Sequence, residues 1–80
     1  MKRVVTYDVI RGNNYDRFYE FVKEAKAEKI TESTYLFDTN LNQDAFQKKL
    51  KWAFNKGDNV SYITENNNVG LFYIKISFEK

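Results

Sequence analysis

Residues 4–18 read VVTYDVIRGNNYDRF, and this stretch combines a strand, a break and the start of a helix. The β-branched and aromatic residues at its beginning favour a strand, which we predict over Lys2–Val9. Successive side chains of a strand point to opposite faces. One face of this strand therefore carries Val5, Tyr7 and Val9, and the other carries Val4, Thr6 and Asp8.

The rest of the chain continues the alternation of strand and helix patterns. After the break at 11–14, apolar residues recur three and four apart, which predicts a helix from Tyr15 to about Ala27. The same criteria, with polar caps and turn residues, give the remaining segments. They are a strand over Lys29–Asp38, a helix capped by Asn40 or Asn42 that runs to about Asn55 and is closed by Gly57, a strand over Asn59–Glu65, a turn at 66–68, and a strand over Val69–Phe78.

We interpret these segments as one ferredoxin-like β-α-β-β-α-β domain of the α+β class, spanning residues 1–80. The expected sheet is antiparallel and has four strands, with the first and third predicted strands in its centre and the last at an edge. Right-handed crossovers would place both helices on one face of this sheet. The other face would then be uncovered, and Asp8 would lie on it.

Composition excludes several kinds of chemistry. The chain contains no Cys and no His. It therefore has no disulfide, no thiolate metal site, and neither the Ser-His-Asp nor the Cys-His arrangement of nucleophilic enzymes. Hydrolysis would have to rely on carboxylates, lysines, tyrosines or a divalent metal held by oxygen ligands.

Charge and hydropathy limit the partners and the cellular location that we expect for the protein. The net charge of +2 does not by itself indicate nucleic-acid binding. No apolar run is long enough for a membrane span and no signal-peptide pattern is present, so we expect a cytoplasmic protein without a membrane partner. Aromatic residues make up 18% of the chain, more than one small core is expected to absorb, which favours a homodimer.

Asp8 is the candidate for metal chemistry. It follows a central strand and lies on the predicted uncovered face. One carboxylate is a poor Mg²⁺ site, but two copies of Asp8 brought together by a twofold axis would suffice. The alternative is that Asp8 is a polar residue at the end of a strand and hydrogen-bonds the loop at Gly12–Asn14.

Two further segments are candidate binding surfaces. The second helix carries Lys48, Lys49 and Lys51 beside Trp52, a basic and aromatic surface that could follow a phosphate backbone. Lysines near a helix C-terminus are also favoured by the helix dipole alone. The segment Leu71–Phe78 is apolar on both faces although it lies at an edge, so it could dock a protein partner or simply pack inward behind Lys75.

The chain also resembles a known family. The segments VVTYDV, GNNYDRFYEFVKEAK and ESTYLFDT are similar to elements of the small CRISPR-associated protein two family and of its stand-alone SinR-like relatives. The virulence-associated protein D ribonucleases share this architecture. The resemblance implies a homodimer with facing sheets, the first-strand aspartates near the twofold axis, and a role in phage defence. It also implies that Asp8 binds Mg²⁺ and is catalytic, and that Arg11 contacts nucleic acid, although the Arg-rich stretch of the family is reduced here to Arg11 and Arg17.

The sequence leaves two functions open. The first is a homodimer that binds DNA or RNA and cleaves it as an Mg²⁺-dependent endonuclease. The second is a non-enzymatic inhibitor or regulator from a phage or mobile element, acting by protein–protein binding. A third possibility, an RNA-recognition module, requires aromatic residues where this chain has Asp58 and Asn59.

Overall fold

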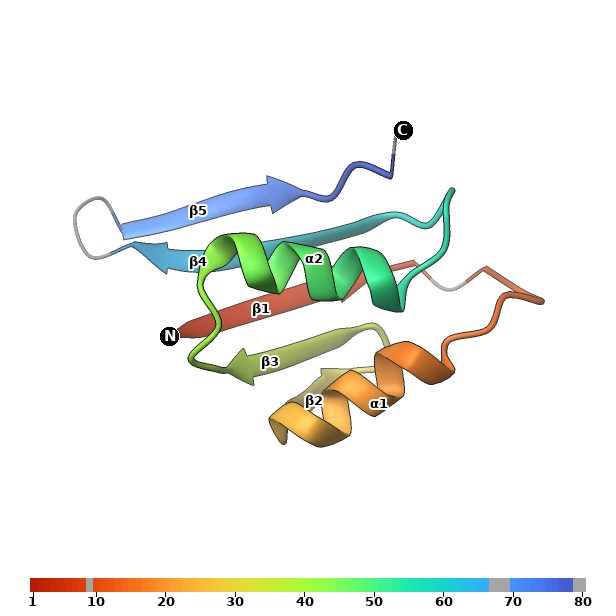
Figure 1. The fold of residues 1–80 in the computed structure, drawn as a ribbon, viewed down its shortest axis with the longest axis horizontal. Helices are drawn as coiled ribbons and strands as arrows, with labels where there is room; N and C mark the ends of the chain where they lie inside the picture. Colours follow the sequence, from red (N-terminus) through yellow and green to blue (C-terminus); the bar gives the residue numbers. More distant parts are fainter. Residues whose placement is uncertain (9, 67–69, 79–80) are drawn as a thin grey trace.

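A computed structural model describes residues 1–8, 10–66 and 70–78. The chain folds as an α+β domain with two helices and one antiparallel sheet (Figure 1). In chain order the elements are β1 (Lys2–Tyr7), α1 (Asp16–Ala25), β2 (Glu28–Thr31), β3 (Thr34–Asp38), α2 (Gln43–Ala53), β4 (Val60–Asn66) and β5 (Gly70–Lys75).

The sheet has five strands in the order β2-β3-β1-β4-β5, and every neighbouring pair is antiparallel. The first strand of the chain is therefore the central one. On one side Val5 pairs with Tyr35 of β3, and on the other it pairs with Tyr62 of β4. The centre of the sheet thus joins segments that are far apart in the sequence.

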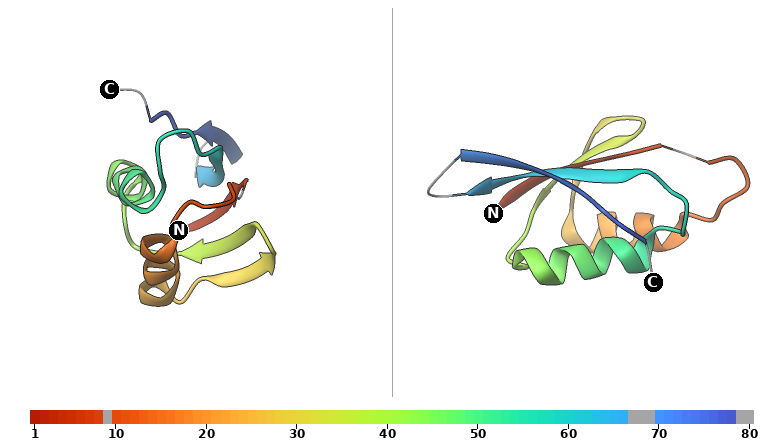
Figure 2. Two further views of the ribbon diagram at one scale, coloured as in Figure 1. Left: turned by 90° about the vertical axis from the view of Figure 1, so that its right-hand side faces the viewer. Right: turned by 90° about the horizontal axis from the view of Figure 1, so that it is seen from above.

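Both helices lie on the same face of the sheet (Figure 2). The alternation predicted for the first strand is confirmed, because Val5 and Tyr7 are buried towards the helices while Thr6 is exposed on the opposite face. Arg3 continues the buried set, and Val9 lies outside the described residues. One face of the sheet is covered, and the other has no helix over it.

Aromatic rings fill the space between the helices and the sheet. Phe18 of α1 is fully buried, and its ring centroid lies 5.0 Å from that of Tyr7, 5.4 Å from that of Tyr35 and 4.6 Å from that of Phe54. Edge-on and tilted contacts at these distances stabilise a core beyond the burial of apolar area. Phe18 therefore joins α1 to β1, to β3 and to the end of α2.

The expectation of four strands is wrong, because the segment predicted as one strand, Lys29–Asp38, folds as a hairpin. It forms β2 and β3, which are joined through Glu32 and Ser33. The segments predicted from the sequence have only one strand between the two helices. By themselves they therefore do not give the β-α-β-β-α-β order of the predicted fold. In the structure the hairpin supplies it, and β5 follows as a fifth strand paired with β4.

The helix ends and the last strand also differ from the prediction. α1 stops at Ala25 because Lys26 adopts a left-handed conformation, with φ of 54°. α2 begins after Asn42, whose side chain accepts a hydrogen bond from the Ala45 amide at 2.8 Å, and it ends at Ala53 well before Gly57. Within the described residues the last strand covers Gly70–Lys75 and does not continue to Phe78, and residues 67–69 of the predicted turn and strand lie outside the described residues.

Neither α1 nor α2 combines the length and the apolar character that a membrane-spanning helix requires, which holds for the part of the chain that the structure describes.

The aromatic core predicts a strong effect of Phe18→Ala. Removing a fully buried ring leaves a cavity, and we expect the free energy of unfolding to fall by about 3–5 kcal/mol. Urea denaturation followed by far-UV circular dichroism measures the change. Tyr19→Ala is the matched control on the same helix: the Tyr19 side chain is 47% exposed, so the expected loss is about 1 kcal/mol. Equal losses in the two variants would contradict a core centred on Phe18.

Candidate functional site

Asp8 lies directly after β1 and is exposed, as the sequence predicts for a residue on the uncovered face. Its backbone N–H donates to the Asn59 carbonyl at 3.0 Å, and the Asn59 Nδ2 donates to the Asp8 carboxylate at 3.4 Å. The hydrogen bonds of Asp8 therefore connect it to the segment before β4. They do not connect it to the loop at Gly12–Asn14, which was the alternative role for this residue.

A small cavity of about 240 Å³ lies beside Asp8, over the ends of β1, β4 and β5. Its lining is largely polar and contains one acid and one base, Asp8 and Lys75. Lys75 pairs across the strands with Ser61, and Ser61 pairs with Thr6, so these three side chains form one row at the floor of the cavity. The row offers hydroxyl groups and an ammonium group rather than a second carboxylate.

The Asp8 side chain does not form a complete metal site within one chain. No three Asp or Glu side chains gather in any place across residues 1–8, 10–66 and 70–78. An Mg²⁺ ion held by Asp8 would therefore need ligands from a second copy or from a phosphate. The metal role of Asp8 stays a prediction that depends on dimerisation.

Tyr7, the neighbour of Asp8 in the Tyr-Asp pair, points to the opposite side of the sheet. Its ring is buried in the aromatic core and its hydroxyl donates to the Glu32 carbonyl at 3.5 Å. Burial raises the pKa of the Tyr7 hydroxyl well above its ordinary value. The hydroxyl thus stays protonated and is remote from any chemistry at Asp8.

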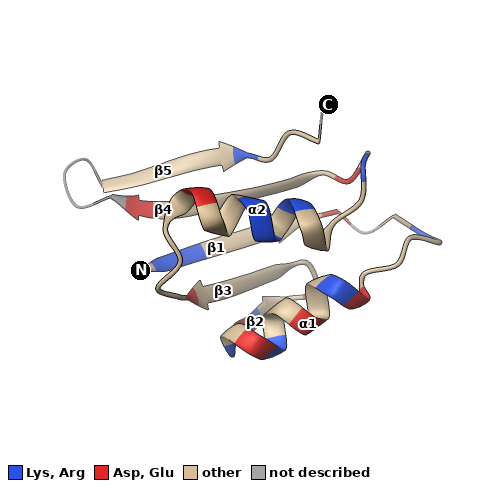
Figure 3. Cartoon of the chain, viewed as in Figure 1, with Lys and Arg blue, Asp and Glu red and all other residues tan. Residues whose placement is uncertain are grey.

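The three predicted lysines, Lys48, Lys49 and Lys51, lie on the helix layer, which the sheet separates from Asp8 (Figure 3). Two of the three lysines are already in ion pairs. Lys48 Nζ lies 3.2 Å from a carboxylate oxygen of Asp44, and Lys49 Nζ lies 3.6 Å from one of Glu24. Lys51 has no ion pair within the described ranges, and Arg11 is exposed in the connection between β1 and α1.

Trp52 forms a cationic and aromatic cluster with residues from both helices. The Lys49 Nζ lies 4.5 Å from the centroid of the Trp52 ring, and the Arg17 guanidinium carbon lies 5.7 Å from it. Arg17 Nε also donates to the Trp52 carbonyl. The face of an indole ring attracts cations. A nucleobase that stacked on Trp52 would therefore have to displace Lys49 or Arg17.

Sequence analysis missed Asp58, which is buried at the end of the helix layer. Its carboxylate accepts hydrogen bonds from Asn13 Nδ2 at 3.1 Å, from the Tyr15 hydroxyl at 3.1 Å and from the Asn55 amide at 2.8 Å. The Tyr15 hydroxyl in turn accepts from the Ile10 amide at 2.9 Å. Asp58 thus joins the start of α1 to the turn after α2.

Comparison of the chain with family models, with curated proteins and with solved structures gives no significant match. The resemblance to CRISPR-associated proteins therefore stays a prediction from short motifs. The candidate surfaces have to be judged on their geometry alone.

The Asp58 contacts predict that Asp58→Ala destabilises the fold. The change leaves three buried or half-buried donors without an acceptor, and we expect the free energy of unfolding to fall by about 3 kcal/mol. Thermal and urea unfolding measure the loss. Asp38→Ala, which removes an exposed carboxylate paired with the N-terminal ammonium group, is the control and should cost less than about 1 kcal/mol. A small effect at Asp58 would show that its contacts are not structural.

Proposed function

We propose that this chain is a dimeric, non-catalytic protein-binding module with a ferredoxin-like fold, and that the uncovered face of its sheet is the binding surface. The order of elements from β1 to β4 is β-α-β-β-α-β, and these four strands lie in the order β2-β3-β1-β4. Both features support the ferredoxin-like assignment. β5 is then a fifth strand added beyond β4, which widens the uncovered face.

The observation that carries this proposal is an apolar row across four strands. Leu36 pairs with Val4, Val4 pairs with Ile63, and Ile63 pairs with Tyr73. Paired residues point to the same side of a sheet, and here that side is the one without helices (Figure 2). Ile63 is 40% exposed and Tyr73 is 67% exposed. A contiguous apolar patch of this kind on a small soluble domain is typical of a protein interface.

Polar rows flank the apolar row, as the rim of an interface requires. One of them is the row of Thr6, Ser61 and Lys75 beside Asp8. On the other side Lys2 pairs with Asp38, and Glu65 pairs with Leu71, which is 71% exposed. The surface therefore has an apolar centre between two margins that are polar except at Leu71 of the edge strand.

The arrangement fits a second copy of the same chain. β1 and β4 are neighbours, and their register runs from Arg3–Thr64 to Tyr7–Val60, so Lys2 and Glu65 continue it by one position. A twofold axis along the strands, between β1 and β4, lays Val4 over Ile63 of the partner subunit. The same axis lays Lys2 over Glu65 of the partner subunit, which brings opposite charges together twice.

Dimerisation is tested with Ile63→Lys. Placing an ammonium group in the apolar row buries an unpaired charge in the dimer, so we expect the dissociation constant to rise at least about tenfold. Sedimentation velocity over a concentration series measures it. Ile30→Lys, at an exposed position of the edge strand β2, is the control and should leave the dimer intact. A wild-type protein that stays monomeric at high concentration would reject the proposed dimer.

Nucleic-acid binding is the second candidate function, and the cluster of Arg17, Lys49 and Trp52 beside Lys48 and Lys51 favours it. This surface belongs to the helix layer, so it would remain accessible in a dimer formed through the sheets. If the dimer also cleaves the nucleic acid, the Asp8 carboxylates of the two copies would hold one Mg²⁺ ion between the sheets. Binding and cleavage would therefore use different faces of the molecule.

Labelled DNA and RNA oligonucleotides test this candidate. Under it, Lys48→Ala with Lys51→Ala lowers the affinity and reduces the slope of log K against log salt by about 0.7–0.9 for each phosphate that a removed lysine had neutralised. Asp8→Ala leaves the affinity unchanged and abolishes cleavage in Mg²⁺ or Mn²⁺. Lys23→Ala with Lys29→Ala, on α1 and on the edge strand β2, also removes two charges and is the matched control outside this cluster. No salt-dependent binding by the wild-type protein, or cleavage that survives Asp8→Ala, would reject this candidate.

A further inference from the structure

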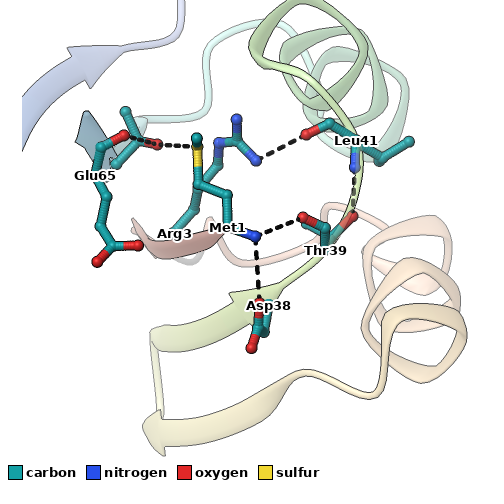
Figure 4. Close-up of polar contacts among 7 residues, drawn as sticks. Met1, Arg3, Asp38, Thr39, Leu41 and Glu65 are labelled. Atoms are coloured by element: carbon teal, nitrogen blue, oxygen red, sulfur yellow. Dashed lines mark hydrogen bonds and ion pairs between the residues drawn. The ribbon is translucent and has the colours of Figure 1, made fainter. Parts of the chain in front are cut away.

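Arg3 is a buried cation on the covered side of the sheet. Its side chain is directed from β1 towards the start of α2, and the residue is only 2% exposed. The guanidinium carbon lies 4.9 Å from the centroid of the Phe46 ring, and Nη1 donates to the Leu41 carbonyl at 3.0 Å (Figure 4). The ring attracts the cation through its quadrupole and the carbonyl through its dipole, and neither carries a charge that would neutralise it.

The charge of Arg3 lacks a carboxylate partner. No ion pair in the described part of the chain includes Arg3, and its Nε is buried without any hydrogen-bond partner there. Figure 4 shows the Glu65 side chain extending away from the guanidinium group. Burial lowers the pKa of Arg3, which reflects the cost of removing the cation from water. An uncompensated buried charge of this kind favours a counter-ion.

A cavity of about 390 Å³ adjoins Arg3 and the beginning of α2. Asn42 and Gln43 contribute to its wall. The Asn42 side chain caps the Ala45 amide, and the Asn42 carbonyl accepts from the Phe46 amide. The first two amides of the helix have no intrahelical acceptor, because residues at these positions never do. The positive end of a helix dipole and an unneutralised guanidinium group therefore face the same cavity.

We propose that this cavity binds an oxyanion of the phosphate type, held between the Arg3 guanidinium group and the first-turn amides of α2. Phosphate matches both partners, since it accepts several hydrogen bonds and neutralises a guanidinium group. Asp44 in the first turn of α2 is the acid near the site, and its charge weakens phosphate binding. Glu65 adjoins the cavity, but its side chain extends away from the guanidinium group (Figure 4). The Met1 ammonium group, also at the wall, is already paired with Asp38. The site lies outside the apolar sheet face, so it does not depend on the proposed dimer.

Titration of the ¹⁵N-labelled protein with inorganic phosphate tests the site, with chloride at equal ionic strength as the reference. We expect saturable shifts of the Gln43 and Asp44 amides that appear with phosphate and are absent with chloride. Arg3→Met keeps an apolar chain of similar length and should abolish these shifts. Lys23→Met removes one exposed charge from α1, outside both the cavity and the sheet face, and should leave them unchanged. Absence of saturable shifts in the wild-type protein, or their persistence in Arg3→Met, would overturn the proposal.

A second variant decides the question if Arg3→Met does not fold. Asp44→Asn removes the acid in the first turn of α2 and leaves Arg3 in place, so phosphate should bind about twofold to fivefold more tightly. Unchanged or weaker binding would instead count against an anion beside Arg3. Titration with glycerol phosphate identifies the source of the oxyanion: tighter binding than inorganic phosphate points to a phosphate monoester, and equal binding points to free phosphate.

Discussion

The packing of two short helices against one face of a sheet determines where this protein can bind anything. α1 and α2 bring Phe18, Phe46 and Leu50 onto β1, β3 and β4, and these side chains are fully buried. Two short helices are too few to cover both faces of a five-stranded sheet. Both α1 and α2 lie on the same face. Some of the aromatic residues that exceed the needs of this core, such as Tyr73, lie on β5, whereas Tyr19 and Trp52 are exposed on the helices. The uncovered face is a direct consequence of how the covered face is filled.

Two buried charged residues sit at opposite ends of the helix layer, and they are satisfied to different degrees. Asp58 accepts several hydrogen bonds, so its burial is compensated within the chain. Arg3 is held by one carbonyl and one ring, and its Nε is unused in the described part of the chain. Buried polar groups that are fully hydrogen-bonded fix a structure, whereas those that are partly satisfied tend to mark a place where something else binds. This contrast is why Asp58 is interpreted as structural and Arg3 as part of a site.

Local patterns in the sequence predicted the strand faces and the helix regions, because both follow from covalent geometry. The alternation at Val4–Tyr7 placed the buried and exposed side chains correctly. The hairpin at Glu32 and Ser33 was missed because no Gly or Pro interrupts a run rich in Thr and aromatic residues, and such residues favour strands on either side of a turn. The exposure of Asp8 and its separation from the lysines followed from placing both helices on one face of the sheet, but the ion pairs of Lys48 and Lys49 did not, since the pair of Lys49 with Glu24 depends on how α1 and α2 pack together. Asp58 resembled an ordinary loop residue because Asn13 and Tyr15, which it contacts, are distant in the sequence.

The central position of β1 has a consequence for how the chain acquires its structure. Val5 pairs with Tyr62, so the middle of the sheet cannot be completed until β4 has left the ribosome. Pairings between segments so far apart raise the contact order, which slows folding. Before β4 is synthesised, only α1 and the β2–β3 hairpin can cover the side of β1 that is buried in the final structure. Nascent chains that stall before residue 60 would therefore be substrates for chaperones that recognise exposed aromatic side chains.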